Sequence, residues 1–165
     1  MDDKRALLRH FLAAIAYRTQ KALRGAPPNF AAFRAAPQVR TPHELVGHMN
    51  SVLGYARTFF VGGEYRPTLR PDFEAEVLRF HSTLADLSRH LEEGTPLQRT
   101  TPENLLQGPF SDAMTHAGQL AMLRRLAGSP VAPENFIVAR IDSANVGPHQ
   151  ADPVSPDEIW PEAPE

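Results

Sequence analysis

The chain has 165 residues, no cysteine, and 17 basic against 19 acidic residues, which gives a net charge of −2. This length favours a single domain with a sizeable core. The lack of cysteine excludes disulfides, zinc–thiolate sites and a cysteine nucleophile, and the balanced charge is not that of a nucleic-acid-binding protein.

The apolar segments are too short and too often interrupted for a membrane protein. No run approaches the roughly 20 residues that are needed to span a bilayer. The chain starts with MDDKRALLRHFLAAIAYR, in which acids come first and charges interrupt the apolar part, unlike a signal peptide. We therefore expect a cytoplasmic protein with no membrane or nucleic-acid partner.

Residues 2–24 are expected to form the first helix. Asp2 and Asp3 stand where negative charge stabilises a helix N-terminus. Apolar side chains recur at helical spacing and predict its buried face. These residues are Leu8, Phe11, Leu12, Ile15, Ala22 and Leu23. The loop that follows, over residues 26–40, is expected to be anchored by Phe30 and Phe33.

The second expected helix covers residues 41–61 and opens with a capping box. Thr41 is the cap, a proline follows in the first turn, and Glu44 reaches back to the cap. Its buried face is predicted to be Leu45, Met49, Val52, Ala56, Phe59 and Phe60. His48 lies on that face and points inward, either as a metal ligand or as a core histidine bonded to a backbone carbonyl. Gly54 indicates close packing.

A third helix is expected over residues 71–93, after a loop at 62–70. Its apolar residues alternate by four and three, which is the narrow seam of a helix bundle. The seam is Phe73, Val77, Phe80, Leu84, Leu87 and Leu91. After this helix, the segment from Thr101 to Leu106 predicts a short helical turn.

Four further histidines are not assigned to a site. His10 is expected to be solvated or hydrogen-bonded, and His43 to be exposed in the first turn of its helix. His81 flanks the apolar seam, either as a partly buried surface residue or as a hydrogen-bond donor near the site. His90 is expected to be solvated.

The fourth expected helix, residues 109–127, is the one around which the chain is organised. It begins at a Gly108-Pro109 break, and Gly128 ends it. Leucines and alanines at helical spacing predict that one side of it is buried.

An acid, an imidazole and an amide share the inner face of this helix: Asp112, His116 and Gln119. Asp112 and His116 are one turn apart, roughly 6 Å along the axis, so their ligand atoms can converge on a single ion. Burying both groups without a partner would be costly. The plain alternative is an ordinary helix pair of residues four apart, which contributes a few tenths of a kcal/mol.

Four amphipathic helices separated by glycine and proline breaks predict an all-α, up-and-down four-helix bundle over residues 1–145. Residues 133–141 are either a short helix or an apolar strap across the bundle. Residues 146–165 are proline-rich and without helical period, so we expect an irregular tail held by Ile159 and Trp160, or partly loose. Packing of this kind can bring His48 to face His116.

Two segments resemble the DinB-like (damage-inducible, metal-dependent) superfamily, TPHELVGHMNSVLGYA around His48 and DAMTHAGQLAMLRRLAG around His116. The resemblance covers about residues 5–145. The superfamily motif has one histidine in the second helix, and in the fourth a histidine pair spaced by four, then one residue, then Gly-Gln. His48, His116 and the Gly-Gln ending at Gln119 match this motif. Asp112 is a departure, because it stands where the first histidine of the pair is expected.

The resemblance implies that His48, Asp112 and His116 bind a divalent metal ion, and that Gln119 orients a ligand or contacts substrate. The aspartate leaves the metal open between zinc, nickel and iron, since two histidines and a carboxylate also form the facial triad of non-haem iron. The resemblance further implies a small-molecule substrate, such as a low-molecular-weight thiol, and a homodimer. It assigns no catalytic residue.

Two classes of function stay open. In the first, the protein is a metal-dependent enzyme of thiol-S-transferase or hydrolase type, whose ion lowers the pKa of a bound thiol or water. In the second, it is a non-catalytic helical bundle, metal-stabilised or metal-free, that acts as a binding or interaction module. A water-filled cleft beside the ion favours the enzyme, and an apolar lid over it favours the module.

Overall fold

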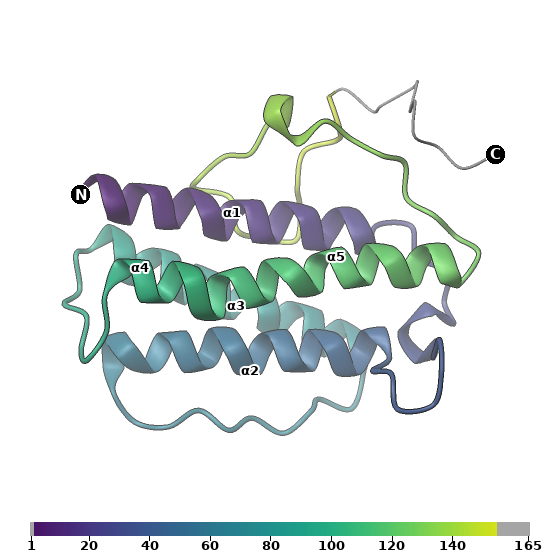
Figure 1. Cartoon of the computed structure of the whole chain (residues 1–165), viewed down its shortest axis with the longest axis horizontal. Helices are drawn as coiled ribbons and strands as arrows, with labels where there is room; N and C mark the ends of the chain where they lie inside the picture. Colours follow the sequence, from purple (N-terminus) through teal and green to yellow (C-terminus); the bar gives the residue numbers. More distant parts are fainter. Residues whose placement is uncertain (1, 155–165) are drawn as a thin grey trace.

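Four long helices lie side by side in the computed structural model, which describes residues 2–154 (Figure 1). They are α1 (Asp3–Leu23), α2 (Pro42–Val61), α3 (Phe73–Glu92) and α5 (Ser111–Leu126). No β-strand occurs between residues 2 and 154, which confirms the all-α class. No helix in that part of the chain is long and apolar enough to cross a bilayer.

Side chains that precede the helices satisfy their first backbone N–H groups. Asp2 accepts a hydrogen bond from the backbone N–H of Arg5 at 2.9 Å and so caps α1. The predicted capping box of α2 is confirmed, because Glu44 N–H donates to Thr41 Oγ1 and Thr41 N–H donates to the Glu44 carboxylate. Asp72 caps α3. These caps fix where each helix starts, and therefore which residues share a face.

The core lies between the helices, because each of them buries the apolar side that its sequence predicts. α1 packs against α3 and α5, and α2 packs against the same two helices. Side chains from all four meet in one buried cluster, and its members include Leu12, Met49, Phe80, Leu84 and Leu120. Burying each such side chain contributes about 1.5–3 kcal/mol. The contact between α2 and α5 is the one that matters for the candidate site.

The helix expected over residues 109–127 is longer at its beginning than predicted, and it is kinked. α4 (Pro102–Leu105) starts the helical path, and η2 (Leu106–Phe110) continues it with wider turns into α5. The predicted Gly108-Pro109 break is the kink, where Gly108 has φ −93° and ψ −105°. Pro109 lacks an N–H to donate to the preceding turn, which interrupts the helical hydrogen bonds there. The kink places Asp112 and His116 in the first two turns of α5.

The segment after α5 is a strap across α1 (Figure 1). Between residues 127 and 154 its one helical element is the short turn η3 (Phe136–Val138), so residues 133–141 form the expected strap and the alternative of a short helix is reduced to that turn. Residues 146–154 are irregular, as predicted. The expected anchors Ile159 and Trp160 lie outside the described residues.

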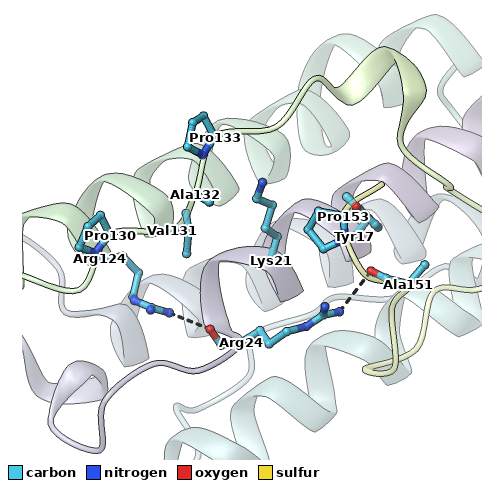
Figure 2. Close-up of a pocket in the computed structure, with 10 residues that line it drawn as sticks. All are labelled: Tyr17, Lys21, Arg24, Arg124, Pro130, Val131, Ala132, Pro133, Ala151 and Pro153. Atoms are coloured by element: carbon cyan, nitrogen blue, oxygen red, sulfur yellow. Dashed lines mark hydrogen bonds between the residues drawn. The ribbon is translucent and has the colours of Figure 1, made fainter. Parts of the chain in front are cut away.

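Polar contacts tie this strap to the helices beneath it (Figure 2). The buried carboxylate of Glu134 accepts hydrogen bonds from Tyr17 at 2.6 Å and from Lys21 at 2.9 Å. Arg24 donates to the backbone oxygens of residues 150 and 151, and Arg124 donates to the backbone oxygens that end α1. A cavity of about 240 Å³ lies between the strap and the helices. The cationic side chains that line it already donate hydrogen bonds to other groups of the protein.

The long loop between α2 and α3 runs along the outside of α2 (Figure 1). Two glycines of α2 leave the space that its side chains occupy. A Cβ added to Gly54 would lie 2.0 Å from the ring of Tyr65, and one added to Gly47 would lie 2.3 Å from Leu69 Cδ1. The close packing predicted from Gly54 is thus present, with a loop residue as its partner.

A buried acid joins α2, this loop and α3. Glu76 is fully buried and accepts hydrogen bonds from Asn50 at 2.7 Å, from the backbone N–H of Arg70 at 2.9 Å, and from Arg79. Burial alone would raise the pKa of this carboxyl, but the hydrogen bonds outweigh it and hold its pKa below the usual value. The network fixes how α2, which carries His48, lies against α3.

Candidate metal centre

His48, Asp112 and His116 come together at the contact between α2 and α5. One ligand atom from each, an imidazole nitrogen or a carboxylate oxygen, lies within 4.8 Å of the other two. No other group of three histidine, aspartate or glutamate residues between residues 2 and 154 converges in this way. The structure therefore places all three predicted ligand residues around one point.

The three side chains differ in burial. His116 is buried, with 7% of its surface exposed, and His48 is half-buried. Their rings meet edge to face, with centroids 4.8 Å apart and planes at 74°. Asp112 keeps 47% of its side chain exposed, so one side of the cluster reaches solvent.

Gln119 fixes the protonation of His116. Its Oε1 lies 2.8 Å from Nδ1 of His116, and a carboxamide oxygen can only accept a hydrogen bond. Nδ1 therefore carries the proton, and in the neutral ring Nε2 is left with its lone pair. Metal-binding histidines are commonly oriented in this way, through a hydrogen bond from the nitrogen that does not bind the metal. Gln119 thus lies where it can orient His116.

His116 Nε2 lies close to a carboxylate oxygen without a hydrogen bond to it. Nε2 is buried without a hydrogen-bond partner, although Oδ1 of Asp112 lies only 3.2 Å away. Two electron-rich atoms at this distance repel each other unless a cation or a proton lies between them. The donor set, two imidazoles and one carboxylate, suits a divalent transition metal. Both observations fit a cation at this point.

The surroundings of His48 favour its neutral form. Burial lowers the pKa of His48, and the positive charge of Arg40 and the neighbouring His116 lower it further. The carboxylate of Asp112 acts in the opposite direction but does not outweigh them. A neutral imidazole is the form that binds metal, so at neutral pH His48 is ready to act as a ligand.

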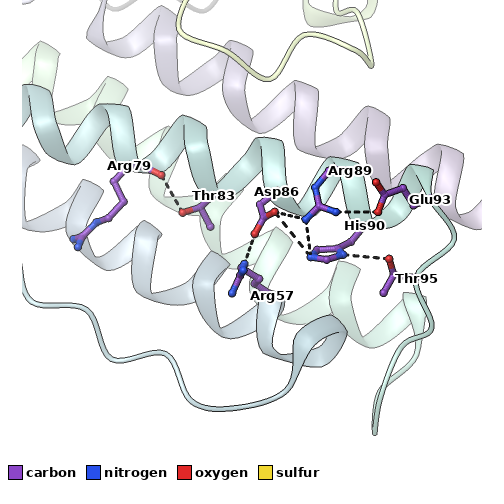
Figure 3. Close-up of polar contacts among 8 residues, drawn as sticks. All are labelled: Arg57, Arg79, Thr83, Asp86, Arg89, His90, Glu93 and Thr95. Atoms are coloured by element: carbon purple, nitrogen blue, oxygen red, sulfur yellow. Dashed lines mark hydrogen bonds and ion pairs between the residues drawn. The ribbon is translucent and has the colours of Figure 1, made fainter.

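Two of the remaining histidines are buried, which corrects the expectation from the sequence. His90, predicted to be solvated, is 6% exposed, stacks on Phe60, and has Nδ1 3.1 Å from Thr95 Oγ1 (Figure 3). His81 is 5% exposed and contacts Gln20 and the backbone oxygen of Val146, so it belongs to the seam with the strap.

His43 and His10 lie nearer the surface. His43 is half-buried, with its ring edge to face against Phe73, and is therefore less exposed than expected. His10 is exposed and hydrogen-bonded to Ser143 at 3.1 Å, as predicted. None of these four residues joins the cluster of His48 and His116.

Arg40 is the residue near the centre that sequence reasoning missed. It stands just before the cap of α2, and its charge acts on His48. Its position beside a helix start carries no recognisable signal, because lysines and arginines are common in loops. Only the folded arrangement brings it near the cluster.

No family model, curated protein or solved structure matches this chain. The resemblance described above therefore depends on the residues of the two motif segments. The geometry of the cluster is an independent observation, because it comes from the folded chain.

Proposed function

We propose that the protein is a metal-dependent enzyme in which His48, Asp112 and His116 hold a divalent cation. The observation that carries this proposal is their convergence, with ligand atoms within 4.8 Å of one another and an unpartnered Nε2 on the buried His116. In a tetrahedral zinc site with bonds of about 2.1 Å, ligand atoms lie roughly 3.4 Å apart. The 3.2 Å between His116 and Asp112 is already of that order.

The fold and the family belong to the same proposal. We propose a DinB-like bundle over residues 1–145 as the domain. In the structure α1 and α2 each pack against α3 and α5 rather than against each other. This neighbour order differs from that of a simple up-and-down bundle, in which consecutive helices pack together. A homodimer, the common state in that superfamily, is proposed with it. Light scattering on the purified protein tests the dimer directly.

Three protein ligands leave coordination positions open, which is the arrangement of catalytic rather than structural zinc sites. A cation bound there lowers the pKa of a coordinated thiol or water, so that a nucleophile exists near neutral pH. In this chain Gln119 bonds Nδ1 of His116 and so leaves Nε2 available to bind the cation, and Asp112 contributes the negative charge. We propose transfer of a low-molecular-weight thiol, or hydrolysis, as the reaction.

Exposure favours the enzyme over a non-catalytic module. Asp112 is half-exposed and Gln119 is exposed, and a groove with Gln119 in its wall opens next to the cluster. A purely structural metal would be expected in a closed site with four protein ligands. The alternative role as a metal-stabilised interaction module has no such observation in its favour.

Metal analysis followed by an activity assay tests this function. The full-length protein is purified without chelator, its metal content is measured, and zinc, nickel and iron(II) are titrated into metal-free protein. We expect one ion per chain, lost in His116→Ala and kept in His10→Ala. Turnover of an electrophilic substrate should then require the metal, and a further requirement for an added thiol separates thiol transfer from hydrolysis. Lack of binding for all three metals would refute the proposal.

A further inference from the structure

A groove of about 600 Å³ opens between α5 and the loop that precedes α2. Gln119 and Leu45 form part of its wall, and each lies one helical turn from a residue of the cluster, His116 and His48. The groove therefore lies within one helical turn of the candidate metal centre on both α2 and α5.

The wall of the groove is largely apolar. Val39, Met122 and Leu126 line it and remain 39%, 54% and 58% exposed. Met122 and Leu126 are four residues apart on α5, so they form one continuous strip along the groove. Exposed apolar side chains gathered beside a polar site are typical of a ligand-binding groove. The strip suits an aliphatic or aromatic body.

Within the described part of the chain, residues 2–154, Arg40 is the one charged residue that lines the groove, and no acid does. No hydrogen bond or ion pair holds its guanidinium to any residue between 2 and 154. Glu44, the acid of the capping box, is already occupied by Arg34 and by the backbone N–H of Thr41. Arg40 is therefore a cation without a counter-ion at the rim of an apolar groove.

The loop side of the groove is fixed in place. Gln38 has φ 69°, in the left-handed region that costs energy for a residue with a side chain. Arg34 donates to the backbone oxygen of Val39 and to both carboxylate oxygens of Glu44, the latter at 3.0 Å each. These contacts bridge the loop to the first turn of α2. The groove is therefore formed before a ligand arrives.

We propose that this groove binds the substrate, and that the substrate is an amphiphilic organic anion whose acid group contacts Arg40. A divalent cation would bring two positive charges, Asp112 would offset one of them, and Arg40 would add one. The net charge of this region would then be +2, which favours an anionic ligand. The role of the bound anion as substrate rests on the metal-enzyme proposal. Binding of the anion to the groove does not depend on that proposal, because Arg40 and the apolar strip are present without a metal.

Binding of a homologous series of acids tests this inference. Butyrate, hexanoate and octanoate, with uncharged octanamide, are titrated calorimetrically into the full-length protein, once metal-free and once zinc-loaded. Each added methylene should raise affinity about two- to fourfold, since a fully buried methylene is worth about fourfold. Octanamide should bind about tenfold more weakly than octanoate.

Matched variants assign the effect to the groove. In the metal-free protein, Arg40→Gln should remove the preference for octanoate over octanamide, and Met122→Gln should flatten the dependence on chain length. Arg66→Gln is the control, because Arg66 is exposed and pairs with Glu64. Both Arg40 and Met122 are exposed, so neither substitution should unfold the protein.

The outcomes separate the two proposals. If zinc fails to bind while octanoate still binds through Arg40, the metal enzyme is refuted and the groove stands. If zinc binds but octanoate and octanamide bind equally, or Arg66→Gln acts like Arg40→Gln, the groove inference is overturned and the metal centre stands. Absence of binding by all four ligands in both forms of the protein also overturns it.

Discussion

Nε2 of His116 lies 3.2 Å from Oδ1 of Asp112, and no hydrogen bond joins the two atoms. On the other side of the ring, Nδ1 of His116 donates a hydrogen bond to the carbonyl oxygen of Gln119. The helix periodicity alone would allow an ordinary aspartate–histidine pair. With Nδ1 bonded to Gln119 and the ring neutral, Nε2 and the carboxylate oxygen are two acceptors lying close together, which is the arrangement that a cation would stabilise.

Metal binding should raise the stability of the protein. At a free zinc concentration of one hundred times Kd, the expected stabilisation is about 2.7 kcal/mol. His116→Ala should abolish this increase and change metal-free stability little, because water can fill the space left beside the half-exposed Asp112. Thermal unfolding with zinc or with EDTA measures both, with His10→Ala as control. An equal zinc-induced shift in His116→Ala would contradict the site.

Asp112→His should retain the metal. The imidazole can supply a nitrogen from the same helical position, and it restores the histidine pair of the DinB-like motif. Asp112→Ala should bind zinc more weakly by at least tenfold, because one ligand is lost. Competition with a chromogenic chelator gives the affinities. Equal affinity of wild type and Asp112→Ala would show that the aspartate is not a ligand.

The helices were predictable because their signals are local. Caps such as Thr41 with Glu44, and apolar residues three and four apart, lie within one or two turns of each other, so the sequence contains them directly. The meeting of His48 and His116 followed from the same reasoning, since each lies on the apolar face of its helix. Gln119 was also found in this way, as the residue one turn after His116.

Features that depend on irregular segments were not predictable. His81 is buried because the backbone at Val146, 65 residues later, covers it, and His90 because it stacks on Phe60 and contacts Thr95. Helical periodicity places both residues at the margin of an apolar face. It gives no information on which other segments of the chain cover their side chains. Arg40 was missed for a related reason, because its lack of a counter-ion arises only when Arg34 occupies Glu44.

Gln119 should act on the metal through His116. Gln119→Leu removes the acceptor for Nδ1–H, so His116 can adopt the other tautomer, and zinc affinity should fall about 10–100-fold. Gln119→Glu keeps an acceptor at the same place and should retain tight binding. Because Gln119 is exposed, metal-free stability should stay within about 0.5 kcal/mol of wild type in both variants. Equal zinc affinities for Leu and Glu would rule out the orienting role.

Two glycines should respond oppositely to alanine. A Cβ at Gly54 meets the ring of Tyr65 at 2.0 Å, so Gly54→Ala should displace the loop and cost about 1–3 kcal/mol. Gly118 on α5 has nothing within 4 Å of its ideal Cβ, so Gly118→Ala should stabilise by about 0.5–1 kcal/mol. Urea unfolding gives both values. If both variants are stabilised, the loop does not pack on α2 as described.

Buried histidines should make the metal-free protein less stable in mild acid. Burial lowers the pKa of His81, and the nearby His149 lowers it further, although the hydrogen bond with the backbone oxygen of Val146 acts the other way. The unfolded chain therefore takes up a proton near pH 6.5, where the folded protein still resists it. The stability that this residue contributes is complete above that pH and is lost as the pH falls from about 6.5 towards the folded-state pKa.

Urea unfolding in EDTA at several values between pH 8 and 5 measures this loss. His48 and His90, whose pKa values are also lowered by burial, contribute in the same direction. His81→Gln should therefore reduce the slope of stability against pH without removing it, and should lower stability most at pH 8. The control His10→Gln, at an exposed position, should keep the wild-type slope. An unchanged slope in His81→Gln would mean that His81 titrates alike in both states, which its contact with the strap argues against.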